Sequence, residues 1–243
     1  MTALLVTSCT CAMTVGGGFL ALRLEAYRAF VIAFSAGALV ASALMNVIPD
    51  ALELLTKSGS PLHHHHIMFA CSLGFLSFYL LEQVTHKPDD EHASMAVDIG
   101  HAGLWGAAGI SVHSLIDGVA IGEAFHAGVA VGWIVALAVI VHKFADGVST
   151  VSIIVTTGRS AKLAKVMVLL TAVAPLIGLG IQALVPLPLS VLALFLGWFA
   201  GVFLYLGAAA LIPAAHASSQ SSWLPAATLA GIMLVYLVSR AAA

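Results

Sequence analysis

The chain has 243 residues, of which 61% are hydrophobic and only 8% are charged, whereas soluble domains carry about a quarter charged residues. Its mean hydropathy is +1.07, which argues against a water-soluble fold. The formal net charge of −2 leaves no basic surface that could neutralise many phosphates, so we expect no nucleic-acid partner.

Eight apolar runs, each about long enough to cross the hydrocarbon core of a membrane as a helix, are separated by polar breaks. They cover residues 3–22, 29–49, 67–85, 101–124, 128–155, 164–185, 189–212 and 223–241. The first run lacks a preceding basic segment and a small-residue cleavage site, so we expect a transmembrane helix there and not a removed signal peptide. Because most connections are short, sequential helices should be antiparallel neighbours. We therefore expect an all-α integral membrane protein, a bundle of about eight transmembrane helices forming a single domain over residues 1–243.

The basic residues of the loops predict the orientation of this bundle, because cytoplasmic loops carry an excess of Lys and Arg. One side collects Arg23, Arg28, Lys87, Arg159, Lys162 and Lys165, and the other only Lys57 and Arg240. The first side should be cytoplasmic, which places both termini outside. We expect a multi-pass protein of a plasma or inner membrane.

Two of the polar breaks are rich in histidine or acidic residues. Residues 57–66 contain His63, His64, His65 and His66, and residues 86–101 combine imidazoles with carboxylates. Histidine-rich tracts can capture metal cations, but they are compositional signals and seldom form a defined site. Metal capture and simple solvation therefore remain open for both loops.

Two consecutive apolar runs carry the same polar motif, His-x-x-x-Asp-Gly-Val. It reads HSLIDGV at residues 113–119, with His113 and Asp117, and HKFADGV at residues 142–148, with His142 and Asp146. Residues four apart lie on one face of a helix, and ionisable side chains at membrane depth usually mark a site. Two imidazoles and two carboxylates suit zinc and other first-row divalent ions better than Mg²⁺ or Ca²⁺. An intrahelical hydrogen bond is the alternative for each pair, but the duplication favours a shared metal site.

Three further residues within these motifs bear on the same site. Gly118 and Gly147 follow the two Asp residues, and small residues allow membrane helices to approach closely, so we expect them to bring the two motif helices within ligand distance. Lys143 lies three residues before Asp146, within helical reach. It forms either a structural ion pair or an electrostatic element of transport, and both roles are compatible.

Accessory candidates lie outside the two motifs. Glu123 follows Asp117 by six residues and should lie at an aqueous mouth of the site. Met45 offers a thioether, although ordinary apolar packing is the more common role of methionine. Asn46 and Asp50 bracket Pro49, where a proline frees backbone carbonyls that could line an opening.

The motifs HSLIDGVAIG and HKFADG resemble those of the ZIP (Zrt/Irt-like) family of metal transporters, and the resemblance extends more loosely to MNVIPDAL at 45–52 and GVFLYLGAAALIP at 201–213. It implies eight transmembrane helices, extracytoplasmic termini and transport toward the cytoplasm. It also implies a primary site between the fourth and fifth helices, with His113, Asp117, His142 and Asp146 as ligands.

The chain departs from family members that hold two metal ions. Ser114, Lys143 and Ala174 stand where those members supply an Asn and two acids, which weakens a second metal site. Lys143 can then replace the second cation by its own ammonium, as in some other branches of the family. Ile116 and Ala145 stand where many relatives have proline, so the helix kinks of those relatives are not expected here.

The sequence thus favours a divalent-metal transporter, with zinc first and iron, manganese or cadmium as alternatives. An intramembrane zinc-dependent hydrolase is the rival function, because His and Asp can also hold a zinc ion that activates water. Such an enzyme needs a distinct general base, and no further acid clearly supplies it, so we expect no enzyme. We expect no organic cofactor, and as partners the metal substrate, membrane lipid and, as one candidate assembly, a homodimer.

Overall fold

The computed structural model describes residues 1–85, 102–185 and 188–242, and in these ranges the ordered elements are all helical. The α-helices are α1 (Thr2–Arg23), α2 (Arg28–Ser42), α3 (Ile48–Lys57), α4 (His64–Thr85), α5 (Ala102–Ala127), α6 (Val129–Thr156), α7 (Ala161–Leu184), α8 (Leu189–Leu204), α9 (Ile212–Ser218) and α10 (Leu224–Ala242). Within these described ranges, seven helical spans are long and apolar enough to cross a membrane, and α10 adds a shorter apolar helix. The predicted all-α membrane bundle is therefore confirmed.

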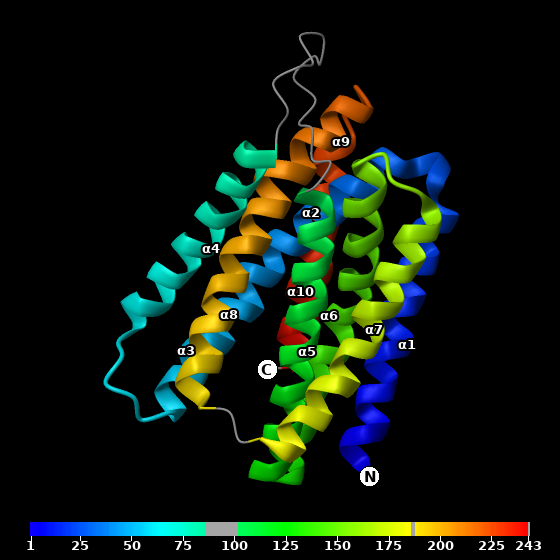
Figure 1. Cartoon of the computed structure of the whole chain (residues 1–243). Coiled ribbons are helices and arrows are strands. Elements are labelled where there is room, and N and C mark those ends of the chain that lie inside the picture. The colour runs from blue at the N-terminus through cyan, green and yellow to red at the C-terminus, as the bar shows by residue number, and fades with distance from the viewer. Residues whose placement is uncertain (86–101, 186–187, 243) are drawn as a thin grey trace.

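The helices pack in two groups that lie against each other along α2 and α6 (Figure 1). In one group α6 packs on α1 and α5, and α7 packs on α5 and α1. In the other, α2 packs on α10, and α8 packs on α3 and α4. The fourth and fifth predicted spans, α5 and α6, are thus direct neighbours.

Two helical spans, the second and the seventh, extend beyond the ends that the sequence predicted. The second was expected to end at residue 49, but α2 continues through a π-helical turn, Ala43–Val47, into α3, giving a span of 30 residues, Arg28–Lys57. The seventh was expected to end at residue 212, but α8 continues through the π-helical turn Tyr205–Leu211 into α9. In both, a proline occupies the first turn after the π-helical turn, where its missing N–H costs no helical hydrogen bond.

Helix α4 begins earlier than expected. Its first turn contains His64, His65 and His66, which the sequence analysis assigned to a loop. The backbone N–H of His63 donates to Nδ1 of His66 over 3.0 Å, so the tract is ordered at the start of the helix. The other histidine-rich stretch, 86–101, lies outside the described residues.

The motif glycines do allow close helix approach, but not between the two motif helices as we expected. A Cβ at Gly118 of α5 would collide with the carbonyl of Pro175 in α7, and one at Gly147 of α6 would collide with the carbonyl of Thr14 in α1. Each glycine therefore faces the helix behind its motif. The prediction that they bring α5 and α6 together is wrong, because the face opposite each His–Asp pair packs elsewhere.

The crossing of α5 and α7 provides a matched pair of glycines for a stability test. A Cβ at Gly178 would collide with the carbonyl of Leu115, whereas one at Gly180, on the same helix, would meet no atom within 4 Å. We expect Gly178→Ala to destabilise the protein by about 1–3 kcal/mol through overpacking, and Gly180→Ala to be neutral or stabilising. Thermal unfolding of both variants in one detergent checks this, and equal melting temperatures would contradict the packing described.

Candidate metal centre

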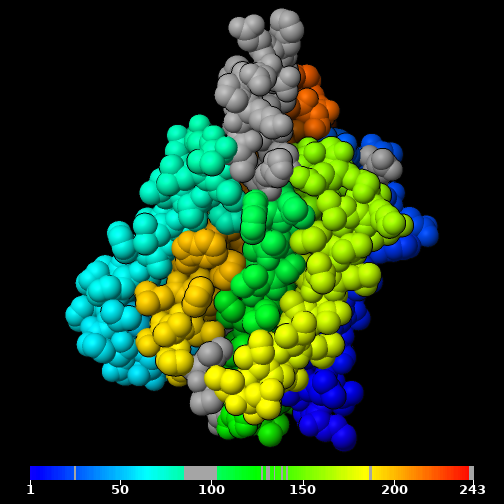
Figure 2. Space-filling view, viewed as in Figure 1, coloured from blue at the N-terminus to red at the C-terminus, as the bar shows by residue number. Residues whose placement is uncertain are grey.

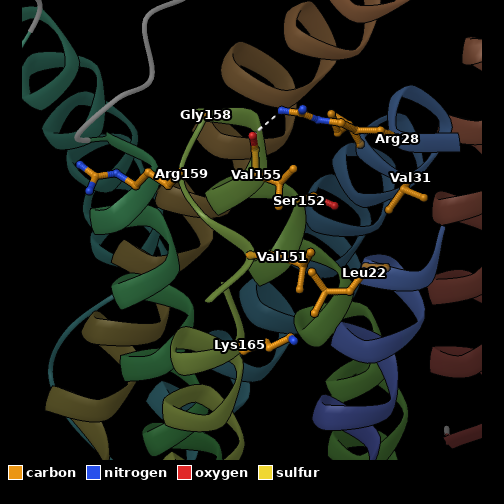
Figure 3. A pocket seen from close by; sticks show the side chains of 12 residues that line it. Leu22, Arg28, Val31, Val151, Ser152, Val155, Gly158, Arg159 and Lys165 are labelled. Carbon is orange, nitrogen blue, oxygen red and sulfur yellow. Dashed lines mark hydrogen bonds between the residues drawn. The ribbon is translucent and has the colours of Figure 1, made fainter. Parts of the chain in front are cut away.

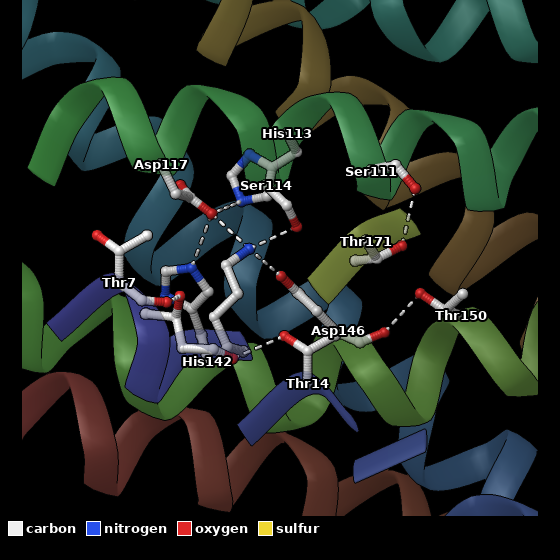
Figure 4. A network of polar contacts seen from close by, with 12 residues as sticks. Thr7, Thr14, Ser111, His113, Ser114, Asp117, His142, Asp146, Thr150 and Thr171 are labelled. Atoms are coloured by element: carbon white, nitrogen blue, oxygen red, sulfur yellow. Dashed lines mark hydrogen bonds and ion pairs between the residues drawn. The ribbon is translucent and has the colours of Figure 1, made fainter. Parts of the chain in front are cut away.

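The structure brings the four residues of the repeated motif into one cluster between α5 and α6 (Figure 4). His113 and Asp117 project from α5, and His142 and Asp146 from α6. All four are buried, and one ligand atom of each lies within 4.8 Å of the others. Among the described residues, this is the one group of three or more His, Cys, Asp or Glu side chains close enough to hold a metal ion. We call it the four-residue cluster.

Asp117 contacts three other side chains of the site. Its Oδ2 atom lies 3.5 Å from Nε2 of His113 on its own helix and 3.4 Å from Nε2 of His142 on α6. The same oxygen lies 2.5 Å from Nζ of Lys143. One carboxylate of α5 therefore holds together polar groups from both helices.

Lys143 lies inside the cluster. Its side chain is fully buried, and besides Asp117 its Nζ donates to Oδ2 of Asp146 over 2.6 Å and to Oγ of Ser114 over 2.7 Å. An ammonium has three N–H donors, and three acceptors surround this one. The predicted pair with Asp146 is confirmed, whereas the contacts across to Asp117 and Ser114 did not follow from the spacing along one helix.

The cluster combines opposite charges. Asp117 and Asp146 place two carboxylates in it, and Lys143 supplies one ammonium against them. Nδ1 of His113 and Oγ of Ser149 are the two buried side-chain N or O atoms without a hydrogen-bond partner among the described residues. The ring nitrogen of His113 that lies toward Asp117 is Nε2, and a neutral imidazole nitrogen is a common metal ligand. The donor set therefore suits a divalent cation that can share the carboxylates with the ammonium.

Aromatic side chains of α8 hold the His113 ring in place, which the sequence analysis missed. The ring of Phe203 meets it edge-on at 4.9 Å between centroids, and that of Phe199 lies 6.1 Å away. The spacing of four residues between the two phenylalanines was the available signal. It places both rings on one face of α8, but does not show which helix that face meets.

The accessory candidates divide into two sets. Ser114 and Lys143 belong to the hydrogen-bonded surroundings of the four-residue cluster, as described above. The others are not among its four ligand candidates. Met45 is 38% exposed, and Asn46 accepts a hydrogen bond from Ser239 of α10. Asp50 is exposed but interacts electrostatically with His142 and Asp117. Their part in metal binding stays a prediction.

Glu123 also lies outside the four-residue cluster, near the end of α5. Gln182 of α7 donates through Nε2 to Oε1 of Glu123 over 3.3 Å, and the same Nε2 lies 2.8 Å from Nδ1 of His126. Gln182 is 9% exposed, and the sequence analysis did not single it out. A lone glutamine gives no periodic signal, so only the packing of α5 on α7 reveals this contact.

Comparison with known proteins identifies the family of the chain. A family model described as ZIP zinc transporter matches residues 86–238, which include both motif helices. The chain belongs to the ZIP zinc transporter family. The predicted resemblance is thereby confirmed, and with it a multi-pass integral membrane protein.

Two curated relatives of the family carry the name zinc transporter. The chain is similar to zinc transporter zipt-7.2 of Caenorhabditis elegans, with 32% identity over 139 residues, covering 52% of this chain and 29% of the relative. It is also similar to zinc transporter zipt-7.1 of Caenorhabditis briggsae, with 31% identity over 106 residues, covering 42% of this chain and 27% of the relative. The matched part thus spans less than a third of either relative.

Proposed function

We propose that this chain carries a divalent metal ion, zinc first, across the membrane through the four-residue cluster between α5 and α6. The observation that carries the proposal is the burial of two imidazoles and two carboxylates within 4.8 Å of one another. Such mixed nitrogen and oxygen ligands suit zinc, and the ZIP family membership points to the same substrate. Iron, manganese and cadmium share enough ligand chemistry to remain rival substrates.

The proposed site holds one metal ion at a time, and Lys143 takes the place of a second cation. Ala174, where binuclear relatives have an acid, is buried and apolar. Without metal, the ammonium of Lys143 neutralises part of the charge of Asp117 and Asp146. An incoming metal ion competes with this ammonium for both carboxylates, and the ammonium in turn assists release by reclaiming them.

Metal uptake into sealed vesicles separates this proposal from its rival. The purified chain is reconstituted in liposomes, and the uptake of zinc, iron, manganese and cadmium is measured with metal-sensitive dyes trapped inside. Zinc accumulation above that of protein-free liposomes supports the carrier. Hydrolysis products of the bilayer lipids without metal accumulation would support the intramembrane hydrolase, which the family match does not favour.

We further propose that the basic end of the bundle is cytoplasmic, because Lys and Arg are enriched on that side of membrane proteins. The proposal that transport runs toward the cytoplasm rests on the resemblance to the ZIP family alone. Lys57 and Lys162 are exposed and belong to opposite predicted sides. We expect Lys57→Cys, with the three native cysteines replaced by serine, to react with an impermeant maleimide on intact cells. Lys162→Cys should react only after permeabilisation, and the reverse pattern would contradict the orientation.

A further inference from the structure

A second polar feature lies away from the metal centre. A cavity of about 330 Å³ opens where the end of α1, the start of α2, the end of α6 and the start of α7 meet (Figure 3). Three of the described side chains that line it are cationic, and none of the described lining residues carries a carboxylate. The charged side chains at this cavity are therefore cationic, whereas the four-residue cluster contains two carboxylates.

Two of the cations come from different helices. Arg28 begins α2, and its guanidinium donates to the carbonyl of Val155 near the end of α6, which fixes the side chain at the cavity. Lys165 projects from the first turns of α7 (Figure 3). Arg159 lies at the rim with its guanidinium directed away from the other two. The positive field in the cavity thus comes mainly from Arg28 and Lys165.

The start of α7 adds to this field. Ser160 caps the helix by accepting a hydrogen bond from the N–H of Leu163, and the cavity is lined by Ala161, the first residue of the helix. Amides of the first helical turn lack intrahelical acceptors, and the helix dipole places partial positive charge there. A helix N-terminus beside two cations is well suited to a phosphate.

The remaining walls of the cavity are mainly apolar, and the hydroxyl of Ser152, which also lines it, is already hydrogen-bonded to Ser35 and to the carbonyl of Val148. Leu22, Val31, Val151 and Val155 line it, so a ligand must combine a negative headgroup with an apolar part. A metal cation does not fit, because it would be repelled by Arg28 and Lys165. We propose that this cavity binds the phosphate of an anionic phospholipid, with the glycerol and the first acyl carbons against the apolar wall. The lipid would then contact α1, α2, α6 and α7 together.

Binding of short-chain lipids to the purified full chain tests the proposal without measuring transport. Dioctanoyl phosphatidylglycerol, dioctanoyl phosphatidylcholine and inorganic phosphate are titrated separately and followed by calorimetry. We expect phosphatidylglycerol to bind tightest, Lys165→Gln to weaken it about fivefold, and Arg28→Gln with Lys165→Gln about 25-fold, since each cation near a membrane surface contributes about fivefold. Lys162→Gln, an exposed lysine on the same helix that does not line the cavity, should leave the affinity unchanged.

Three results would overturn the proposal. Unchanged phosphatidylglycerol affinity in Lys165→Gln and in the double variant would show that the lipid binds elsewhere. Equal affinities for phosphatidylcholine and phosphatidylglycerol would show that the net negative charge of the lipid plays no role. Inorganic phosphate binding as tightly as phosphatidylglycerol would assign the site to free phosphate. Because Arg28 also bonds to Val155, the elution of each variant as a folded species is checked first, and Lys165→Gln alone decides if the double variant does not fold.

Discussion

Replacement of Asp117 by asparagine is expected to reduce zinc uptake by at least about a hundredfold while the protein remains folded in the membrane. Residues that only hydrogen-bond to a metal ligand already contribute about 10- to 100-fold to metal affinity. Asp117 is proposed to be a ligand itself, so its loss should cost at least as much. Its Oδ2 also lies within 3.5 Å of His113, His142 and Lys143. Asparagine keeps the shape of the side chain but removes the charge that these groups share. Uptake into proteoliposomes at matched protein content measures the effect.

A surface carboxylate provides the control for this variant. Glu53 of α3 is exposed and pairs with Lys57 of the same helix at 2.5 Å, so Glu53→Gln also removes one carboxylate but leaves the four-residue cluster intact. We expect near-normal uptake for Glu53→Gln. Near-normal uptake for Asp117→Asn as well would reject the cluster as the transport site.

Replacement of Lys143 by methionine is expected to destabilise the metal-free protein and to strengthen zinc binding. Methionine leaves Asp117 and Asp146 buried without the ammonium that now lies 2.5 and 2.6 Å from them. Removal of one partner from a buried ion pair typically costs about 3–5 kcal/mol. A bound dication restores the balance, so zinc should raise the melting temperature of Lys143→Met far more than that of the unmodified protein. Uptake should slow, because the ammonium no longer competes for the carboxylates at release.

Lys162→Met is the matched control for this second prediction, since Lys162 is an exposed lysine of α7. It should change neither the stability without metal nor the stabilisation by zinc. If Lys143→Met behaved in the same way as Lys162→Met in both measurements, Lys143 would be a structural side chain with no electrostatic role at the metal site.

Local spacing made much of the centre predictable. The repeated motif indicated that His113 and Asp117 share one face of a helix, and that His142 and Asp146 share one face of the next, because side chains four apart on a helix are neighbours. The pair of Lys143 with Asp146 followed in the same way. These predictions depend only on helical geometry, which the sequence specifies.

Contacts between helices were not predictable in the same way. The spacing gives no rotation of α6 relative to α5, so the approach of Lys143 to Asp117 and Ser114 emerged only from the packing. The prediction that Gly118 and Gly147 bring α5 and α6 together was wrong for a related reason. Small residues indicate a close helix contact, but they do not identify the partner, and here the partners are α7 and α1.

The ends of the second and seventh spans were misjudged because of proline. Pro49 and Pro213 lie where an α-helix would be expected to end or kink, since proline lacks the N–H of a helical hydrogen bond. A π-helical turn before each proline instead lets the helix continue. Such turns are rare and have no strong sequence signal, so the spans were predicted too short.

One metal ion is proposed to bind between α5 and α6, with Lys143 in place of a second cation. Anomalous diffraction at the zinc absorption edge, from crystals of the zinc-loaded protein, tests it most directly. We predict a single fully occupied peak about 2.0–2.2 Å from ligand atoms of His113, Asp117, His142 and Asp146. Two fully occupied ions between these helices, or a single ion bound away from the four-residue cluster, would contradict the account.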